Sequence, residues 1–169
     1  MHKLNNNWTC WIHKQNDRNW DISSYIKITS YDNLKDAIIF AENLDENLLK
    51  KSMIFFMKDD IKPLWEDNKN IKGGTFSYKI TNDILNSVWK KLYYYIIGNT
   101  LIENTEILKK ITGLSVSPKK NFCIIKLWIE DINQEIQKLI DDIADTDPFN
   151  IGKLCNIDNQ VCVFKKHEV

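Results

Sequence analysis

Two tryptophans in this sequence lie in polar stretches, where a ring that is to be buried would not be expected. Trp65 is followed at once by Glu66 and Asp67, and the polar run ends at a pair of glycines. Since proline and glycine pairs are typical of loops, the stretch indicates an aromatic ring beside carboxylates in a loop. A flat ring next to a fixed anion suits a planar, cationic ligand that donates hydrogen bonds. The alternative is that Trp65 folds back as an apolar plug under its own loop.

A second tryptophan, Trp20, lies in the polar stretch 15–21, between two segments that alternate like strands. Two tryptophans in two polar loops suggest the two walls of a slot for one flat guest. No group of residues resembles a nucleophile with its base, and binding alone accounts for the pattern. We therefore expect a binding site without catalysis and without a cofactor.

These loops resemble the cap-binding loops of the translation initiation factor 4E family. The resemblance covers about residues 2–143 and rests on Trp20, on the run Pro63-Leu-Trp65-Glu66-Asp67 with Gly73 and Gly74 behind it, and on Trp128. It implies 5′-capped messenger RNA as the ligand, bound as m7GTP or m7GpppN. Methylation at N7 makes guanine cationic, so stacking between Trp20 and Trp65 gains about 1–2 kcal/mol. The family pattern further implies that Glu66 accepts two hydrogen bonds from the edge of guanine and that Trp128 packs against the methyl group.

The phosphate-binding positions depart from the family pattern. Thr75 and Lys119 stand where arginines are expected, and Ile124 stands where a lysine is expected. Because Lys126 shares an alternating strand face with Trp128, the resemblance implies a site made of lysines instead. We expect it to contain Lys119, Lys120, Lys126 and Lys72. Lysine supplies charge without the bidentate fork of arginine, so phosphate binding should be sensitive to salt. The alternative is that the five lysines of residues 109–128 form only a solvated face.

The family also has a second site, on the convex back of its sheet, where a helix of a scaffold or repressor protein docks. The matching positions here are His2, Leu4, Leu34, Ile38, Lys90, Lys91 and Gly98. Ile38 replaces the tryptophan that anchors the partner, and the two lysines replace an apolar residue and an acid. Losing an aromatic anchor weakens an interface by about 2 kcal/mol or more, which implies a changed partner. The alternative is that Ile38 serves helix packing alone.

Composition limits the class of protein. The 169 residues suffice for one domain, expected over 1–169 with a short polar lead-in at 1–7. Lys+Arg 23 balance Asp+Glu 23, so any anion site is local. No apolar run has the length of a signal peptide or a membrane span. We expect a monomer in the cytoplasm, or also the nucleus, with no membrane contact and no metal site. Its cysteines should be reduced, although Cys155 and Cys162 could face each other across a hairpin.

The elements that position these residues follow from apolar periodicity. Strands are expected at 8–14, 25–30, 52–58, 75–80, 111–116, 122–129, 153–156 and 160–165. Helical spacing occurs at 34–44, 85–96 and 132–143. Strands joined by hairpins and interrupted by helices indicate an α+β fold. The resemblance implies a strongly curved eight-stranded antiparallel sheet with three helices on the convex face and ligand loops on the concave side.

Three functional hypotheses follow. The first is a cap-binding protein that recruits capped messenger RNA for translation initiation. The second is a cap-binding translational repressor, or a virus-encoded homologue, that serves a different partner. The third is a protein-interaction module that has kept the fold and lost the ligand, against which the joint presence of Glu66 and three loop or strand tryptophans speaks.

Overall fold

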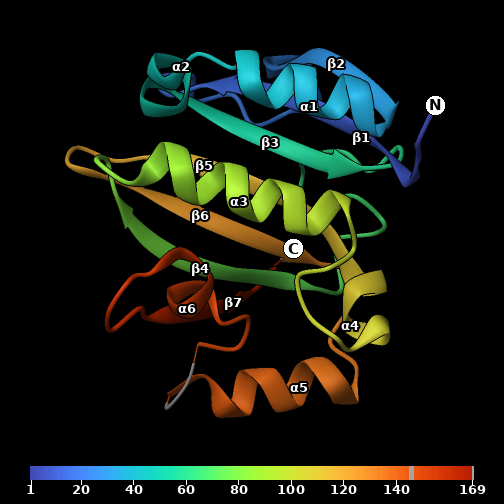
Figure 1. The fold of residues 1–169 in the computed structure, drawn as a ribbon, viewed down its shortest axis with the longest axis vertical. Helices are drawn as coiled ribbons and strands as arrows, with labels where there is room; N and C mark the ends of the chain where they lie inside the picture. The colour runs from blue at the N-terminus through green and yellow to red at the C-terminus, as the bar shows by residue number, and fades with distance from the viewer. Residues whose placement is uncertain (145–146, 169) are drawn as a thin grey trace.

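One antiparallel β-sheet forms the centre of the molecule (Figure 1). The computed structural model describes residues 1–144 and 147–168, so positions 145, 146 and 169 of the expected domain lie outside the described residues. The described residues form seven strands in the spatial order β2-β1-β3-β5-β6-β4-β7. The strands are β1 (Lys3–Lys14), β2 (Tyr25–Asn33), β3 (Ser52–Lys58), β4 (Gly74–Thr81), β5 (Ile111–Pro118), β6 (Phe122–Ile129) and β7 (Cys162–Lys166).

Helices cover one face of this sheet. In the view of Figure 1, α1, α3 and α6 lie in front of the strands, and α5 lies beyond the β7 edge. We call this side the helix-covered face and the opposite side the open face. The helices are α1 (Leu34–Asn43), α2 (Glu46–Lys51), α3 (Leu85–Ile97), α4 (Thr105–Lys110), α5 (Gln134–Asp141) and α6 (Ile151–Cys155), with 3-10 turns η1 (Ile22–Ser24) and η2 (Asp142–Ala144).

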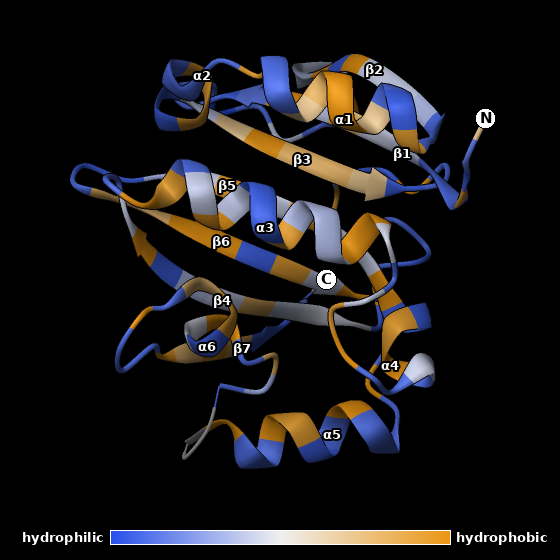
Figure 2. Cartoon of the chain, in the orientation of Figure 1, coloured by the Kyte–Doolittle hydropathy of each residue, from blue (hydrophilic) through white to orange (hydrophobic). Residues whose placement is uncertain are grey.

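The main core fills the space between the sheet and the helices. Helix α3 buries an apolar stripe at helical spacing, which contains Leu85, Val88, Leu92 and Ile96. In the same stripe the fully buried Trp89 stacks on Phe56 of β3 with ring centroids 5.5 Å apart. Figure 2 shows the hydrophobic colour along β3 and much of β6, which run on either side of this helix in the view. Replacing Trp89 by alanine should cost about 3–5 kcal/mol of unfolding free energy, because a large cavity would remain.

A second, smaller cluster lies on the open face. Its buried members are Tyr25, Phe55, Met57, Ile61 and Trp128. Side chains alternate between the two faces along a strand, so β6 sends Trp128 to this cluster and Leu127 to the main core. The sheet therefore has a packed floor on the face that carries the predicted ligand loops.

The α+β antiparallel fold predicted from the sequence is confirmed, with differences in the elements. The strand expected at 153–156 is wrong, because α6 occupies Ile151–Cys155. Asn150 and Asn156 bound this helix in the left-handed conformation, with φ of 52° and 55°, which asparagine tolerates better than most residues. The short helices α2, α4 and α6 add to the three expected. The expected polar lead-in is wrong from Lys3 onward, because β1 begins there and pairs Lys3 with Asn33.

The helices and the cysteines bear on the expected absence of a membrane span and of disulfides. None of the helices in the described part of the chain is long and apolar enough to cross a membrane. All four cysteines are free thiols. Cys155 lies in α6 and Cys162 begins β7, so the alternative of a hairpin that brings them face to face is wrong.

Candidate ligand-binding site

The open face carries a cavity of about 450 Å³ that is lined by both predicted tryptophan loops. Strands β5 and β6 supply its base, and residues distant in the sequence meet there because these strands are central in the sheet. Six of the predicted ligand-binding residues line it, namely Trp20, Trp65, Glu66, Trp128, Lys119 and Lys126. The four residues predicted to read a base are therefore brought together in one cavity.

Trp128 forms a fixed floor of the cavity. Its side chain is only 3% exposed, and its Nε1–H donates a 2.9 Å hydrogen bond to Ser115 Oγ on the neighbouring strand β5. Its ring meets Phe55 edge-on with centroids 6.1 Å apart. Because an indole N–H that is buried needs a partner, this bond fixes the orientation of the ring.

The loop that carries Trp65 is held from inside by Asn70. This side chain is fully buried, and its Nδ2 donates to the carbonyl oxygens of Lys62 and Leu64 at 3.1 and 2.9 Å. Its Oδ1 accepts from the Thr112 hydroxyl at 2.8 Å. An unpaired buried polar group costs about 1–3 kcal/mol, so Asn70 fixes the course of the loop. This residue was not predicted from the sequence, since nothing distinguishes it locally from Asn68, the other asparagine of the loop.

Trp65 itself is half-buried and lines the cavity. The imidazole of His167 stacks on it with centroids 5.4 Å apart and planes 14° from parallel. Because the ring lines the cavity, its position favours a wall of a ligand site over the alternative of a plug under its own loop. Sequence analysis did not single out His167, which follows β7 at the other end of the chain.

Glu66 is exposed and lines the cavity beside Trp65. Among the described residues its carboxylate has no hydrogen-bond or ion-pair partner, so both oxygens can accept from a ligand. Burial raises the pKa of Tyr25 to about 12, and the negative charge of Glu66 adds to that rise. The charge of the Glu66 carboxylate therefore acts on Tyr25, which also lines the cavity.

The loop that carries Trp20 folds back on the end of β1. The indole is 53% exposed and stacks on the ring of His13, with centroids 4.3 Å apart and planes within 6° of parallel. The carbonyl oxygen of Asn19 accepts hydrogen bonds from His13 Nε2 at 2.8 Å and from Ser24 Oγ at 2.7 Å. These contacts hold the backbone next to Trp20.

The predicted phosphate lysines divide into two groups. Lys119 and Lys126 line the cavity. The structure does not bring Lys120 and Lys72 to it: both are exposed, and Lys72 forms an isolated bridge with Asp131 at the far end of the Trp65 loop. Burial lowers the pKa of Lys126, and the positive charges of two other lysines lower it further.

One of those two lysines, Lys165, was missed by sequence analysis. Thr75 of β4 pairs with Trp128 on one side and with Lys165 of β7 on the other, which places Lys165 on the open face. Its ammonium lies 5.4 Å from the centroid of the Trp65 ring. Strand β7 approaches closely at Gly74, where a Cβ would lie 2.5 Å from the Lys165 carbonyl oxygen. Two lysines thus line the cavity, and a third, Lys165, lies beside the Trp65 wall and next to Thr75, the position where the family has an arginine.

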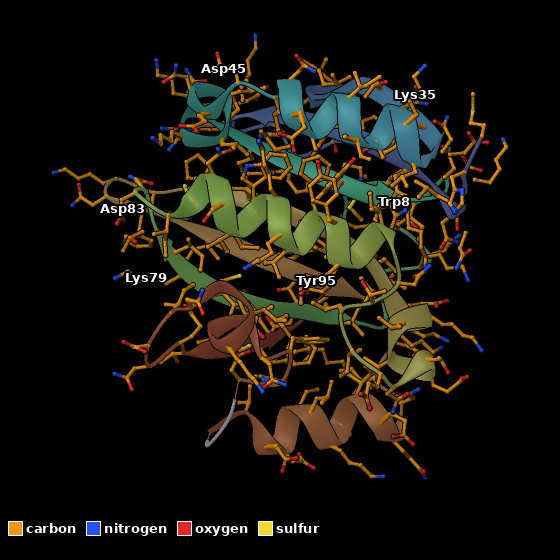
Figure 3. The ribbon with its side chains drawn as sticks, viewed as in Figure 1. Trp8, Lys35, Asp45, Lys79, Asp83 and Tyr95 are labelled. Carbon is orange, nitrogen blue, oxygen red and sulfur yellow. The ribbon has the colours of Figure 1, made fainter. Side chains whose placement is uncertain are left out.

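The helix-covered face has a shallow groove of about 680 Å³ near the start of α1, lined by Met1, His2, Leu34, Lys35, Ile38 and Ile39. Ile38 and Ile39 are 40% and 50% exposed, which favours a docking role for Ile38 over the alternative of helix packing alone. Figure 2 shows hydrophobic colour on this part of α1. Figure 3 shows Lys35 on the same helix. Sequence analysis predicted three of the six residues and missed Ile39.

The other residues predicted for this face do not line the groove. Leu4 packs against the main core. Lys90 forms an ion pair with Glu42 at 3.2 Å, and Lys91 donates to the carbonyl oxygen of Leu154 at 2.8 Å. Gly98 ends α3, where a Cβ would lie 3.0 Å from a backbone oxygen of the helix. Both lysine charges are thus used within the molecule.

The family model of eukaryotic initiation factor 4E matches residues 3–168. The chain belongs to this family. Eukaryotic translation initiation factor 4E of Candida glabrata is 27% identical over 140 residues, covering 79% of this chain and 66% of its own length. The protein of Eremothecium gossypii is 28% identical over 141 residues, covering 79% and 64%. A 4E homolog of Acanthamoeba polyphaga mimivirus is 39% identical over 75 residues, which is 44% of this chain and 26% of that protein. The chain spans about two thirds or less of these relatives.

Solved structures of the 4E family share the fold. Ascaris suum eIF4E-3 in complex with m7G cap has a TM-score of 0.80 at 23% identity, covering 99% of this chain and 92% of that one. Caenorhabditis elegans eIF4E-3 in complex with the 4E-binding protein Mextli and cap analog has a TM-score of 0.79 at 21% identity, covering 98% and 92%. The family resemblance of the sequence is therefore confirmed, together with its fold.

Proposed function

We propose that this 4E-family chain binds the 7-methylguanosine cap of messenger RNA and recruits capped transcripts for translation initiation. One observation carries the proposal: two tryptophans from separate loops, an unpaired Glu66 and the floor residue Trp128 line the same cavity. Family membership supports it, as do the caps in the complexes of the structures with the same fold. Nothing in the proposal requires catalysis, and the ligand leaves unchanged.

The base would be read by its charge and by its edge. A cationic purine between Trp20 and Trp65 gains about 1–2 kcal/mol over a neutral one when it is desolvated. Glu66 would accept from N1–H and from the exocyclic N–H of guanine, two charge-assisted bonds in one plane. Adenine lacks this pair of donors. Trp128 would meet the N7 methyl group from below.

The triphosphate would lie at the rim, among Lys119, Lys126 and Lys165. Burial is the main reason that the pKa of Lys126 is lowered, and repulsion by the positive charges of Lys119 and Lys165 lowers it further. An anion placed between them would relieve this repulsion and gain attraction. Since the side chains of Lys119 and Lys165 are exposed, salt should screen much of this contribution.

Intrinsic tryptophan fluorescence tests the proposal directly. Stacking of a methylated guanine on the indoles should quench the emission when m7GTP is added, whereas GTP should quench far less at the same concentration. Chromatography of the released ligand should return intact m7GTP. Equal quenching by both nucleotides, or quenching by neither, would overturn the proposal.

The groove on the helix-covered face would receive an amphipathic helix of a partner protein while the chain itself remains a monomer. The replaced anchor Ile38 and the internally paired Lys90 and Lys91 favour a second candidate role, in which the chain holds caps as a repressor or virus-encoded homologue with a different partner. Affinity purification with the wild type and with Ile38→Asp as bait, followed by mass spectrometry, distinguishes the two. If the wild type recovers initiation factors and Ile38→Asp does not, recruitment is supported. If the wild type recovers a different helical protein instead, repression is supported.

A further inference from the structure

Each tryptophan wall of the cavity has a histidine stacked against it. His13 lies parallel to Trp20 and His167 lies nearly parallel to Trp65. Both histidines are buried, at 0% and 5% exposure, and neither lines the cavity. The two imidazoles therefore cover the sides of the indoles that face away from the ligand space.

Each histidine also holds the loop that carries its tryptophan. His13 Nε2 lies 2.8 Å from the carbonyl oxygen of Asn19, the residue before Trp20. His167 Nδ1 lies 2.7 Å from the carbonyl oxygen of Asn70, within the Trp65 loop. A carbonyl only accepts, so the imidazole nitrogen must carry the hydrogen in both cases.

These bonds define one tautomer for each histidine. Among the described residues, the second ring nitrogens, Nδ1 of His13 and Nε2 of His167, are buried and have no hydrogen-bond partner. Burial lowers the pKa of His167, which favours the neutral ring. The two histidines come from opposite ends of the chain, His13 in β1 and His167 just after β7, yet they repeat one arrangement of stacked ring and backbone bond.

We propose that His13 and His167 are positioning residues that hold the two tryptophans in place as an open slot before the ligand arrives. The inference rests on the proposed function of the slot. The stacked ring sets the plane of the indole, and the N–H bond sets the backbone beside it. If only a fraction of molecules held the slot open, the apparent dissociation constant would rise by the inverse of that fraction.

The two walls should not depend equally on their histidines. Trp65 also packs against the open-face cluster, and its loop is held by Asn70. Trp20 is the more exposed indole, and within the described residues the only ring stacked on it is that of His13. Loss of His13 should therefore disturb the slot more than loss of His167.

Pairs of substitutions separate stacking from hydrogen bonding. His13→Phe keeps a stacking ring and removes the donor, whereas His13→Gln keeps a donor and removes the ring; His167→Phe and His167→Gln do the same at the other wall. The protein is labelled with 5-fluorotryptophan, and its ¹⁹F resonances are assigned with Trp20→Phe and Trp65→Phe. Thermal melts identify any variant that fails to fold.

We expect His13→Gln to move the Trp20 resonance of the free protein toward the value of a solvated indole and to weaken m7GTP binding about tenfold. His13→Phe should leave that resonance nearly in place and weaken binding about threefold. His167→Gln should shift the Trp65 resonance with a smaller loss of affinity. Saturating m7GTP should return both resonances to their wild-type bound positions, a recovery that general destabilisation would not produce.

The unsubstituted protein offers a measurement that needs no variant. Long-range ¹H–¹⁵N spectra of the imidazoles should show the hydrogen on Nε2 of His13 and on Nδ1 of His167. The opposite tautomers would overturn the proposal, as would Gln variants with unchanged indole resonances and unchanged affinity. A wild type that fails to bind m7GTP would instead overturn the proposed function, while the fluorine resonances of the free protein would still decide whether the histidines position the indoles.

Discussion

The two faces of the sheet differ in how completely their predicted residues come together. On the open face, the four residues predicted to contact a base line one cavity. On the helix-covered face, three of seven predicted residues share a groove, while Lys90 and Lys91 form contacts within the molecule. A small ligand has a fixed shape and charge, so its site requires fixed residues. A protein partner can change its own surface, so its docking site can change as well.

The largest expected effect on ligand binding is at Glu66. Glu66→Gln keeps the size of the side chain but removes the charge and one acceptor, which should weaken m7GTP binding by about 2–3 kcal/mol. The free energy of unfolding should change by less than about 0.5 kcal/mol, as for most surface substitutions. Isothermal titration and urea denaturation measure the two quantities. Glu103→Gln, at an exposed carboxylate away from the cavity, is the matched control, and an equal loss there would contradict the role of Glu66.

Asn70 tests whether the open face depends on a buried support. Asn70→Ala removes three hydrogen bonds and should lower the free energy of unfolding by about 2–3 kcal/mol, because buried partners lose their bonds. Cap affinity should fall too, since the loop of Trp65 loosens. Asn68→Ala, an exposed asparagine of the same loop, should change neither quantity. A normal m7GTP affinity in Asn70→Ala would show that the loop is held by other contacts.

Lys165 tests the rim. Lys165→Ala should weaken binding of m7GTP by about 1 kcal/mol, as for an exposed charge pair, and should reduce the salt slope by about 1. Binding of the monophosphate m7GMP should change less. Lys166→Ala, one residue along β7 and therefore turned to the other side, is the control. Equal affinities of the wild type for m7GMP and m7GTP would dispose of the lysine site altogether.

A smaller effect is expected on the helix-covered face at Lys90. Lys90→Met breaks its ion pair with Glu42, whose other oxygen accepts from the Tyr94 hydroxyl at 2.7 Å. An exposed pair contributes about 0.2–1 kcal/mol, which a double-mutant cycle with Glu42→Gln should recover from urea denaturation. Affinity for m7GTP should stay unchanged. A loss of cap binding would show that the two faces are coupled.

The smallest expected effect is a pH dependence of stability that arises from His167. Its folded pKa is lowered by burial, with Lys126 lowering it and Glu66 and the bond to Asn70 raising it. The unfolded chain therefore takes up the proton first, and stability is full above about pH 6.5 and falls as the pH drops through the folded pKa. Thermal melts between about pH 5 and 8 should show a flatter profile in His167→Phe. An identical profile would mean that other groups carry the dependence.

Local sequence indicated three residues of the slot, and the family pattern added Trp128. Trp20 and Trp65 lie in polar runs where aromatic rings are unusual, and Glu66 directly follows Trp65. Predicting which lysines lie near the phosphates required more than local sequence. Lys126 followed from strand alternation, whereas Lys165 required knowing that β7 pairs with β4, which no local pattern reveals.

Supports were harder to predict than the residues they support. His13 and His167 have roles set entirely by partners in other segments, and the sequence around them looks like ordinary strand. The strand wrongly expected at 153–156 shows the same limit at the level of elements, because two asparagines in the left-handed conformation decide that the segment is a helix. Short apolar segments do not distinguish helix from strand by periodicity.

Strand β7 and His167 lie close to the C-terminal end of the sequence, and the ribosome therefore makes them after almost every other part of the slot. A nascent chain whose first 160 residues have emerged already carries both indoles and Glu66, but it lacks the ring behind Trp65 and the ammonium of Lys165. The slot should consequently be completed only after the segment around β7 has been synthesised and has paired with β4. The proposed ligand should therefore bind weakly to a chain in which this pairing has not yet formed.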